Sequence, residues 1–344
     1  MTKIVITAAG KGTRLLPFTK EMPKEMMPIF SNIFTNKKVV LPLLQYVYEQ
    51  LYSMNFRDYC FIVGREKRSI EDHFTPDEMY LKNLSGDNKK IITKFYEKLE
   101  KSHLVWINQN KPLGFGDAVK RAEKYVGSND FILHAGDVTV LSKRNHPVLR
   151  LIETAKKNPD VKAILLCKKV TDFKRYGVPT VEKISNKLFN VIGVEEKPNK
   201  PKSEFGILPI YYFKSDIFSS LKKIKPGKGK EYQLTDAIQK LIQEKQKVLA
   251  ITLEKNEEEV LSLYSNNEFF DPISLIENYS KNSFVTLEET ICYVLPKKLF
   301  IDTLHKNKNL ESYFFQTISQ KLNANISNEK NQELANIMIA KVKD

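Results

Sequence analysis

Short apolar runs alternate with helical patterns through the first 250 residues, and no other feature of the sequence constrains the fold more. The apolar runs are rich in Val, Ile and Phe, as buried strands are, and cover residues 3–8, 58–63, 104–109, 130–135 and 161–169. Helical periodicity covers residues 41–54, 67–74, 117–126 and 147–157. Strands that alternate with helices predict an α/β layered fold with a largely parallel sheet.

The first apolar run ends in a glycine turn, Ala8-Ala9-Gly10-Lys11-Gly12-Thr13-Arg14. A strand that breaks into such a turn can bring backbone N–H groups against phosphates. The glycine spacing excludes a Walker A loop, and Leu15 stands where a dinucleotide fingerprint needs its third glycine. A bare G-x-G is more often an ordinary turn, but the nearby cations Arg14, Lys20 and Lys24 favour a nucleotide ligand.

Length and composition indicate a globular protein that we expect in the cytoplasm. A chain of 344 residues can bury a large core, with one main domain and an appendage. No apolar run approaches the ~20 residues of a bilayer span, and the N-terminus enters a strand directly, unlike a signal peptide. Three cysteines lie far apart in apolar stretches, which predicts core residues without disulfides or zinc: Cys60, Cys167 and Cys292.

The formal net charge of +14 raises the possibility of a nucleic-acid partner. Only eight of the 55 basic residues are arginines, and the lysines are spread along the chain without a tract. We therefore predict a solvated, lysine-rich surface and no nucleic-acid partner.

Polar residues that follow the predicted strands mark a candidate site, because ligands of open α/β sheets bind outside the carboxyl ends of the strands. Residues 10–14 follow the first strand, Gln109 and residues 114–116 follow the third, and Gly136-Asp137 follows the fourth. A carboxylate beside a nucleotide commonly holds Mg²⁺ while phosphates supply further ligands. Asp137 is thus the candidate metal ligand, with a cap of the following segment as the alternative. The five histidines show no metal-ligand spacing, and His134 reads as a packed strand residue.

Seven segments, in this order, resemble the bacterial and archaeal UTP-glucose-1-phosphate uridylyltransferases, within the sugar-1-phosphate nucleotidylyltransferases: AAGKGTRLLP, PKEMMPI, NQNKPLGFGDAV, LHAGDV, YGVP, VEEKP and EYQLTDAI. The resemblance covers about residues 1–250. It implies a Rossmann-like three-layer α/β/α sandwich with a mixed, mainly parallel sheet. It also implies transfer of a uridylyl group from UTP to glucose 1-phosphate, giving UDP-glucose and pyrophosphate, by Mg-assisted in-line attack on the α-phosphate. The same chemistry with dTTP or another hexose 1-phosphate, and a catalytically silent nucleotide-sugar binder, stay open as alternatives.

The resemblance also implies roles for individual residues. The nucleoside would be bound by Ala9, Gly10, Gln109 and Gly114. The residues expected to be catalytic are Arg14 and Lys24 on the triphosphate, Asp137 on Mg²⁺, and Lys197 on the sugar phosphate. Glu196 would accept sugar hydroxyls, and Gly177 would contact the sugar through its backbone. Lys11, Lys20 and Glu25 stay undecided, since each also fits a solvated loop charge.

The sequence departs from this family after residue 255. Family members usually carry a second magnesium aspartate in a segment like D-x-G-[NT]-[PK], whereas residues 262–272 contain no glycine. The acids available to replace it are Glu268 and Asp271, although Asp271 before Pro272 equally fits a turn. We expect a catalytic domain over 1–279 and a mainly helical extension over 280–344 that docks on the core or on another subunit of a homo-oligomer. The charged segment 75–102 is expected to be a helical insertion near the nucleotide entrance, or equally a plain solvated hairpin of helices, and receives no role.

Overall fold

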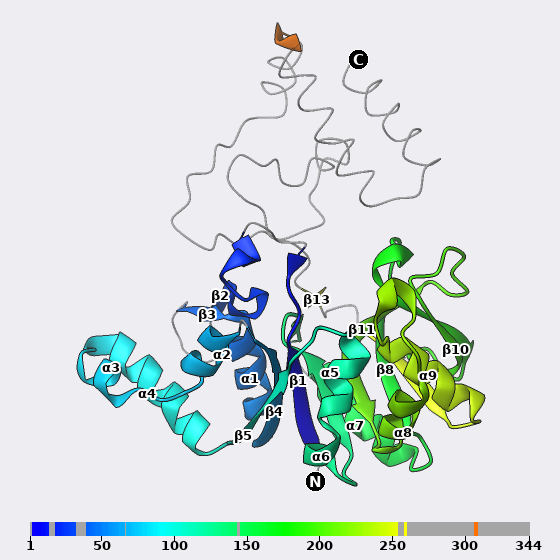
Figure 1. Cartoon of the computed structure of the whole chain (residues 1–344), viewed down its shortest axis with the longest axis horizontal. Helices are drawn as coiled ribbons and strands as arrows, with labels where there is room; N and C mark the ends of the chain where they lie inside the picture. The colour runs from blue at the N-terminus through cyan, green and yellow to red at the C-terminus, as the bar shows by residue number, and fades with distance from the viewer. Residues whose placement is uncertain are drawn as a thin grey trace. The chain divides into compact units, whose positions relative to one another are not determined.

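The computed structural model describes residues 2–13, 18–31, 39–65, 67–142, 145–253, 258–259 and 306–308. The chain divides into two compact units, Met1–Val260 and Leu261–Asp344, and every element below belongs to the first (Figure 1). The predicted domain boundary after residue 279 lies outside the described residues, as does nearly all of the extension 280–344, so both stay predictions.

A nine-stranded sheet forms the centre of the described part of the chain, in the order β5-β4-β1-β6-β11-β8-β12-β10-β9. All of its strands except β10 and β11 run in the same direction, which confirms the mixed, mainly parallel sheet. Its strands are β1 (Lys3–Ala8), β4 (Asp58–Gly64), β5 (His103–Gln109), β6 (Phe131–Ala135), β8 (Ala163–Lys169), β9 (Gly177–Lys183), β10 (Leu188–Glu196), β11 (Phe205–Phe213) and β12 (Val248–Thr252). Two small antiparallel sheets pair β2 (Pro28–Ser31) with β3 (Val39–Pro42) and β7 (Val140–Leu141) with β13 (Glu258–Glu259).

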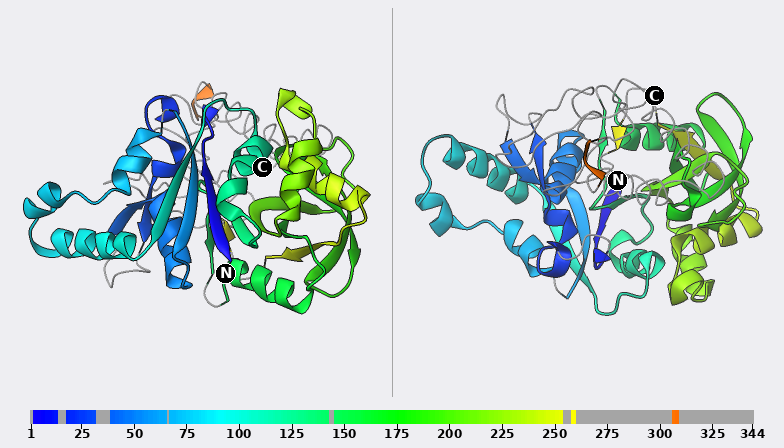
Figure 2. Two further views of the ribbon diagram at one scale, coloured as in Figure 1. Left: turned by 60° about the horizontal axis from the view of Figure 1, so that its bottom comes forward. Right: turned by 90° about the horizontal axis from the view of Figure 1, so that it is seen from above.

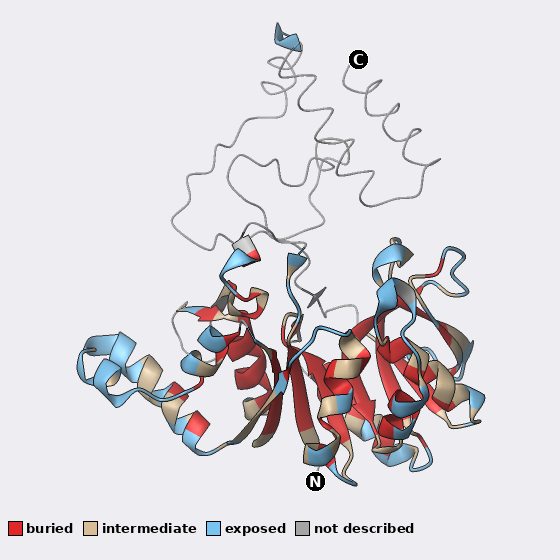
Figure 3. Cartoon of the chain, viewed as in Figure 1, coloured by how far each residue is buried: buried red, intermediate tan, exposed pale blue. Residues whose placement is uncertain are grey.

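Helices cover both faces of this sheet and make the three predicted layers. One face packs against α1 (Leu43–Ser53), α2 (Arg68–His73), α4 (Gly86–Glu100) and α7 (Pro147–Lys157). The other packs against α5 (Phe115–Arg121), α6 (Glu123–Val126), α8 (Asp216–Lys223) and α9 (Leu234–Gln243). β1 sends Val5 to one face and Ile4 and Ile6 to the other. Its continuous apolar run is thus explained, because both sides of a central parallel strand are buried (Figure 3).

The predicted elements lie close to the observed ones. The strand at 3–8 and the helix at 147–157 match in full, while the predicted helix 117–126 is two helices, α5 and α6, separated at Ala122. The helical character expected of residues 75–102 is confirmed by α3 (Glu78–Lys82) and α4, which extend outward beyond the β5 edge (Figures 1 and 2), while a place near a nucleotide entrance stays a prediction. Short 3₁₀ helices are η2 (Phe18–Lys20), η3 (Lys24–Met26), η4 (Phe173–Arg175) and η5 (Lys228–Lys230).

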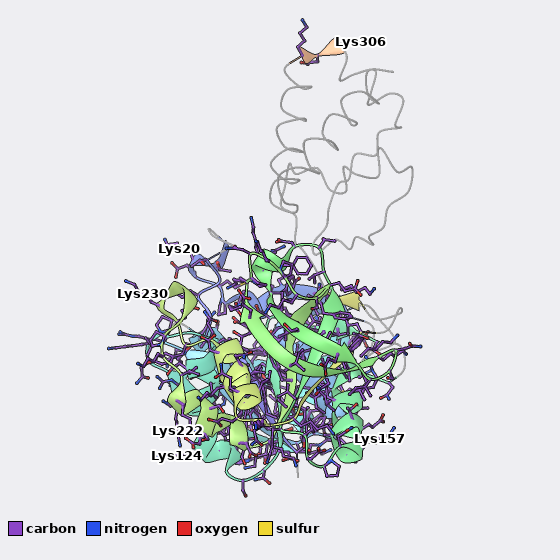
Figure 4. All side chains as sticks on the ribbon, turned by 90° about the vertical axis from the view of Figure 1, so that its right-hand side faces the viewer. Lys20, Lys124, Lys157, Lys222, Lys230 and Lys306 are labelled. Atoms are coloured by element: carbon purple, nitrogen blue, oxygen red, sulfur yellow. The ribbon has the colours of Figure 1, made fainter. Side chains whose placement is uncertain are left out.

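The side chains that were expected in the core are buried. Cys60, Cys167 and His134 have exposed fractions of 0%, 1% and 1%, while Cys292 lies outside the described residues. Exposed lysines come from separate elements, in accord with a dispersed basic surface, as Lys20, Lys124, Lys157, Lys222 and Lys230 illustrate (Figure 4). Within the described residues no helix combines the length and apolar character that crossing a bilayer requires.

Candidate functional site

The turn after β1 meets Lys24 and Asp137 at the carboxyl edge of the sheet. A Cβ atom on Gly10 would lie 3.2 Å from Lys24 Nζ and 3.3 Å from its Cε, so the lysine chain lies along the bare backbone of Gly10. Lys24 Nζ donates to Asp137 Oδ2 at 2.5 Å, and both side chains are partly exposed. Three residues that the sequence predicted separately therefore form one cluster. Arg14 lies outside the described residues, and its role stays a prediction.

A threonine fixes the second half of this turn. Gly12 has a φ of +64°, and Thr19 Oγ1 donates to the Gly12 carbonyl at 2.7 Å. A left-handed φ is accessible to glycine without a steric penalty. The two undecided lysines of this region, Lys11 and Lys20, are exposed, and Lys20 Nζ lies 3.7 Å from Oε1 of the exposed Glu21.

Asp137 lies in a short loop that α1 holds in place. Gly136 N donates to Thr7 O on β1 at 2.8 Å, directly before the aspartate. Gln50 of α1 accepts from Thr139 Oγ1 at 3.0 Å and donates through Nε2 to Val140 O at 3.2 Å. Because Gln50 is buried, these bonds are shielded from water and hold the segment that follows Asp137.

Asp137 offers a partly exposed carboxylate at a strand end, which suits Mg²⁺. This ion typically takes one or two protein carboxylates and completes its octahedron with phosphates and water. No group of three metal-binding side chains occurs among the described residues. Asp137 would contribute one carboxylate, a donor that suits an ion shared with the phosphates of a nucleotide. The two candidate replacements for the family's second aspartate, Glu268 and Asp271, lie outside the described residues.

Gln109 is oriented by two acceptors at the end of β5. Its Nε2 donates to Asp117 Oδ2 at 2.8 Å and to Gly114 O at 3.1 Å. Since a carboxylate and a carbonyl only accept hydrogen bonds, the amide nitrogen must face them, and this settles the orientation of the amide. Gln109 therefore presents its Oε1 as an acceptor.

Gly114 is required by packing against a distant segment. Its φ is +111°, and a Cβ there would lie 2.8 Å from Tyr232 O and 2.8 Å from Glu231 Cβ. Tyr232 N donates to Leu113 O, and Gly116 N donates to Tyr232 O, each at 2.8 Å. The predicted contact of Gly114 with a nucleoside stays a prediction, whereas its contact with Tyr232 accounts for the glycine.

A second cluster brings together the residues expected to bind the sugar phosphate. Gly177 pairs with Glu196 in the register of β9 and β10. Lys197 follows with a φ of +46°, a conformation uncommon for a residue with a side chain. Its Nζ lies 3.1 Å from Glu196 Oε1, and its N–H donates to Tyr176 O at 3.0 Å.

Thr235, in the first turn of α9, was not singled out in the sequence. Its Oγ1 donates to Glu196 Oε2 at 3.1 Å, and its methyl group would lie 2.6 Å from a Cβ on Gly177. The neighbouring Asp236 has a raised pKa, first because of burial and then because of the Glu196 charge. The segment EYQLTDAI was the only signal for Thr235. Residues 231–235 thus contact the Gly114 loop at one end and the Glu196 cluster at the other.

Comparisons with known proteins show that the chain is similar to nucleotidyl transferases. The model of the nucleotidyl transferase family matches residues 3–266. UTP–glucose-1-phosphate uridylyltransferase YngB of Bacillus subtilis is 34% identical over 262 residues, which cover 74% of this chain and 83% of that protein. A solved structure of UDP-glucose pyrophosphorylase complexed with UDP-glucose shares 27% identity over 75% of this chain and 92% of its own, with a TM-score of 0.65. A UTP-bound UGPase from Acinetobacter baumannii shares 27% identity over 75% and 87%, with a TM-score of 0.62.

Proposed function

Because the chain belongs to the nucleotidyl transferase family, we propose that it transfers a uridylyl group from UTP to glucose 1-phosphate, giving UDP-glucose and pyrophosphate. The Bacillus subtilis relative, a UTP–glucose-1-phosphate uridylyltransferase, supports this reaction, as do the two similar structures with bound UDP-glucose and bound UTP. The observation that carries it is the pair of lysine–carboxylate clusters, Lys24 with Asp137 and Lys197 with Glu196.

The first cluster suits the triphosphate. Ala9 and Gly10 lie at the end of β1, where the nucleoside approaches the backbone, and Lys24 crosses Gly10 toward Asp137. When phosphates bind, the Lys24 ammonium donates to their oxygens and neutralises charge on the leaving pyrophosphate, together with Arg14. Phosphoryl-type transfer depends mainly on positioning and on such electrostatic stabilisation, so little acid or base chemistry is required.

Asp137 is the residue that would hold a magnesium ion. When bound, the ion supplies positive charge that stabilises the oxygens of the α-phosphate during in-line attack. The Asp137 carboxylate also holds Lys24 at 2.5 Å, so one side chain organises both cations of this cluster.

Gln109 supplies a basis for selecting the nucleobase. Its Oε1 can accept a hydrogen bond from N3–H of uracil, whereas N3 of cytosine carries no proton to donate. Burial of Gln109 makes an unmatched acceptor costly, and this favours UTP over CTP. Thymine presents the same N3–H, so the residue leaves dTTP as the alternative substrate.

The second cluster suits the sugar phosphate. Lys197 binds the phosphate whose oxygen attacks, and Glu196 accepts hydrogen bonds from sugar hydroxyls. Thr235 occupies Glu196 Oε2, so Oε1 is the oxygen turned toward Lys197 and the sugar. Because Gly177 has no side chain, the methyl group of Thr235 packs directly against the backbone of β9.

A pyrophosphate-release panel tests the proposal. Purified protein with Mg²⁺ is combined with each nucleoside triphosphate and each hexose 1-phosphate, and the fastest turnover is expected with UTP and glucose 1-phosphate. Turnover with dTTP but not with UTP rejects the uridylyl assignment. If no substrate pair is turned over and UDP-glucose still binds measurably, a catalytically silent nucleotide-sugar binder is favoured.

We further expect activity in the cytoplasm as a homo-oligomer. Nucleoside triphosphates and sugar phosphates are multiply charged and do not cross bilayers unaided, so the enzyme must share their compartment. Light scattering of the purified full-length protein measures the number of subunits, and a monomer at micromolar concentration contradicts the oligomer.

A further inference from the structure

A buried ion pair lies beside Lys24 and takes no part in the chemistry described so far. Lys67 Nζ donates to Glu25 Oε2 at 3.0 Å, and the two side chains are 8% and 1% exposed. Glu25 is the central residue of η3 and directly follows Lys24. Lys67 belongs to the loop after β4, where its N–H donates to Gly64 O at 3.2 Å. The pair therefore ties η3 to the loop at the end of β4.

Stability alone is a poor explanation for this pair. Removing two charges from water costs more than their attraction often returns, and apolar replacements of similar volume are frequently as stable or more so. The pKa of Glu25 is raised, with burial as the largest cause, even though Lys67 and Lys24 both act to lower it. Its net electrostatic environment is therefore unfavourable to the charged form, and a role in geometry explains the pair better than a gain in stability.

The local backbone shows why η3 needs an external support. Its internal bonds are few, from Met26 N to Pro23 O at 2.9 Å and from Met27 N to Lys24 O at 3.2 Å, and Pro23 supplies no side-chain cap. A single 3₁₀ turn with such bonds does not fix its own orientation. The loop of Lys67 starts from Gly64, the last residue of β4, which packs against the nucleotide turn, since a Cβ on Gly64 would lie 3.2 Å from Ala9 O.

We infer that Glu25 and Lys67 are a positioning pair, which anchors η3 to the β4 loop so that Lys24 is aimed at Asp137 and the nucleotide phosphates. This inference rests on the proposed function. Both side chains are buried, so we assign them no direct contact with the substrate. Lys24, in contrast, is partly exposed and lies across Gly10.

The test replaces both charges at once. A single substitution would leave one buried charge without its partner and could prevent folding. Glu25→Met combined with Lys67→Met removes both charges and keeps side chains of similar volume. We expect this double variant to unfold at about the wild-type temperature while kcat/KM for UTP falls about 10- to 100-fold, the scale of a slightly misplaced group. KM for glucose 1-phosphate should stay unchanged. The matched control is Glu49→Met with Lys98→Met, an ion pair between α1 and α4 outside the site, and should leave both constants unchanged.

A further comparison separates positioning from a structural effect. In a Lys24→Ala background the Glu25→Met and Lys67→Met changes should add no further loss, because the lysine that they aim is gone. Wild-type kcat/KM for UTP in the double variant, or a full additive loss in the Lys24→Ala background, overturns the inference. If the wild type itself fails to turn over any substrate pair, the proposed function fails. In that case the affinity of the same variants for UTP, measured by calorimetry, tests the positioning role. If the wild type does not bind UTP, the positioning role is overturned as well.

Discussion

Asp137→Ala separates catalysis from folding in this protein. The substitution removes one ion pair, with Lys24 Nζ at 2.5 Å from Asp137 Oδ2 and side chains 23% and 30% exposed. Pairs this accessible contribute about 0–1 kcal/mol to the free energy of unfolding. The same change removes the proposed metal ligand and the carboxylate that holds Lys24. Loss of one preorganised electrostatic group costs about 10²–10³ in kcat, and loss of the metal with it should leave no measurable turnover.

The assay pairs pyrophosphate release with urea unfolding of the same preparation. The matched control is Asp160→Ala, which also removes an aspartate–lysine pair, with Lys247 Nζ 3.1 Å from Asp160 Oδ2. The control should keep full activity and nearly wild-type stability. If Asp137→Ala keeps activity within a few-fold of wild type, the metal assignment is refuted. If the variant no longer unfolds cooperatively, Asp137 is needed for folding, and its assignment to the site alone is refuted.

Three further predictions concern the packing of the site and its response to pH. Gly114→Ala should lower the free energy of unfolding by about 1–3 kcal/mol, because φ is +111° and the new Cβ would lie 2.8 Å from Tyr232 O; an unchanged urea midpoint contradicts this. Thr235→Val should raise KM for glucose 1-phosphate and leave KM for UTP unchanged, since it removes only the hydroxyl that donates to Glu196; Thr235→Ser should restore the hydrogen bond, and equal KM values in the two variants exclude this role. Burial lowers the pKa of three histidines from 6.5, to about 4 for His73 and His134 and to about 3 for His146. Between pH 6.5 and these lowered pKa values the unfolded chain therefore binds more protons than the folded chain. The stability that the neutral histidines contribute is fully present above pH 6.5 and is lost as pH falls through their folded pKa values. Urea unfolding across this range measures the free energy of unfolding, and a value that does not change with pH contradicts the prediction.

Much of the fold was predictable because the patterns that define its elements are local. The mainly apolar run of β1 and the helical period of α7 each depend on neighbouring residues only, and their bounds match the structure in full. The break between α5 and α6 was missed because the sequence around Ala122 continues the helical pattern. Strands β9, β10, β11 and β12 were not identified among the apolar runs, and in that half of the sheet only β8 was predicted from its own residues.

In the candidate site, too, residues marked by local sequence patterns were predicted, and residues that depend on distant partners were not. Asp137 and Gln109 were found from sequence because residues after parallel strands meet at one edge. Glu25 stayed undecided because its partner, Lys67, is 42 residues away, and nothing local distinguishes a buried pair from a solvated loop charge. Thr235 was passed over for a similar reason, since its contact with Glu196 spans 39 residues.

The sequence by itself determined which segments become strands and helices, and which glycines and charged side chains stand at the strand ends. Periodicity and turn chemistry act over a few residues, so the chain carries that information locally. Only the tertiary structure decided which of these side chains meet. Lys24 and Asp137 are 113 residues apart and form an ion pair because β1 and β6 are neighbours in the sheet. Partnerships of this kind depend on strand order and burial, which arise from the packing of the whole sheet between its helices.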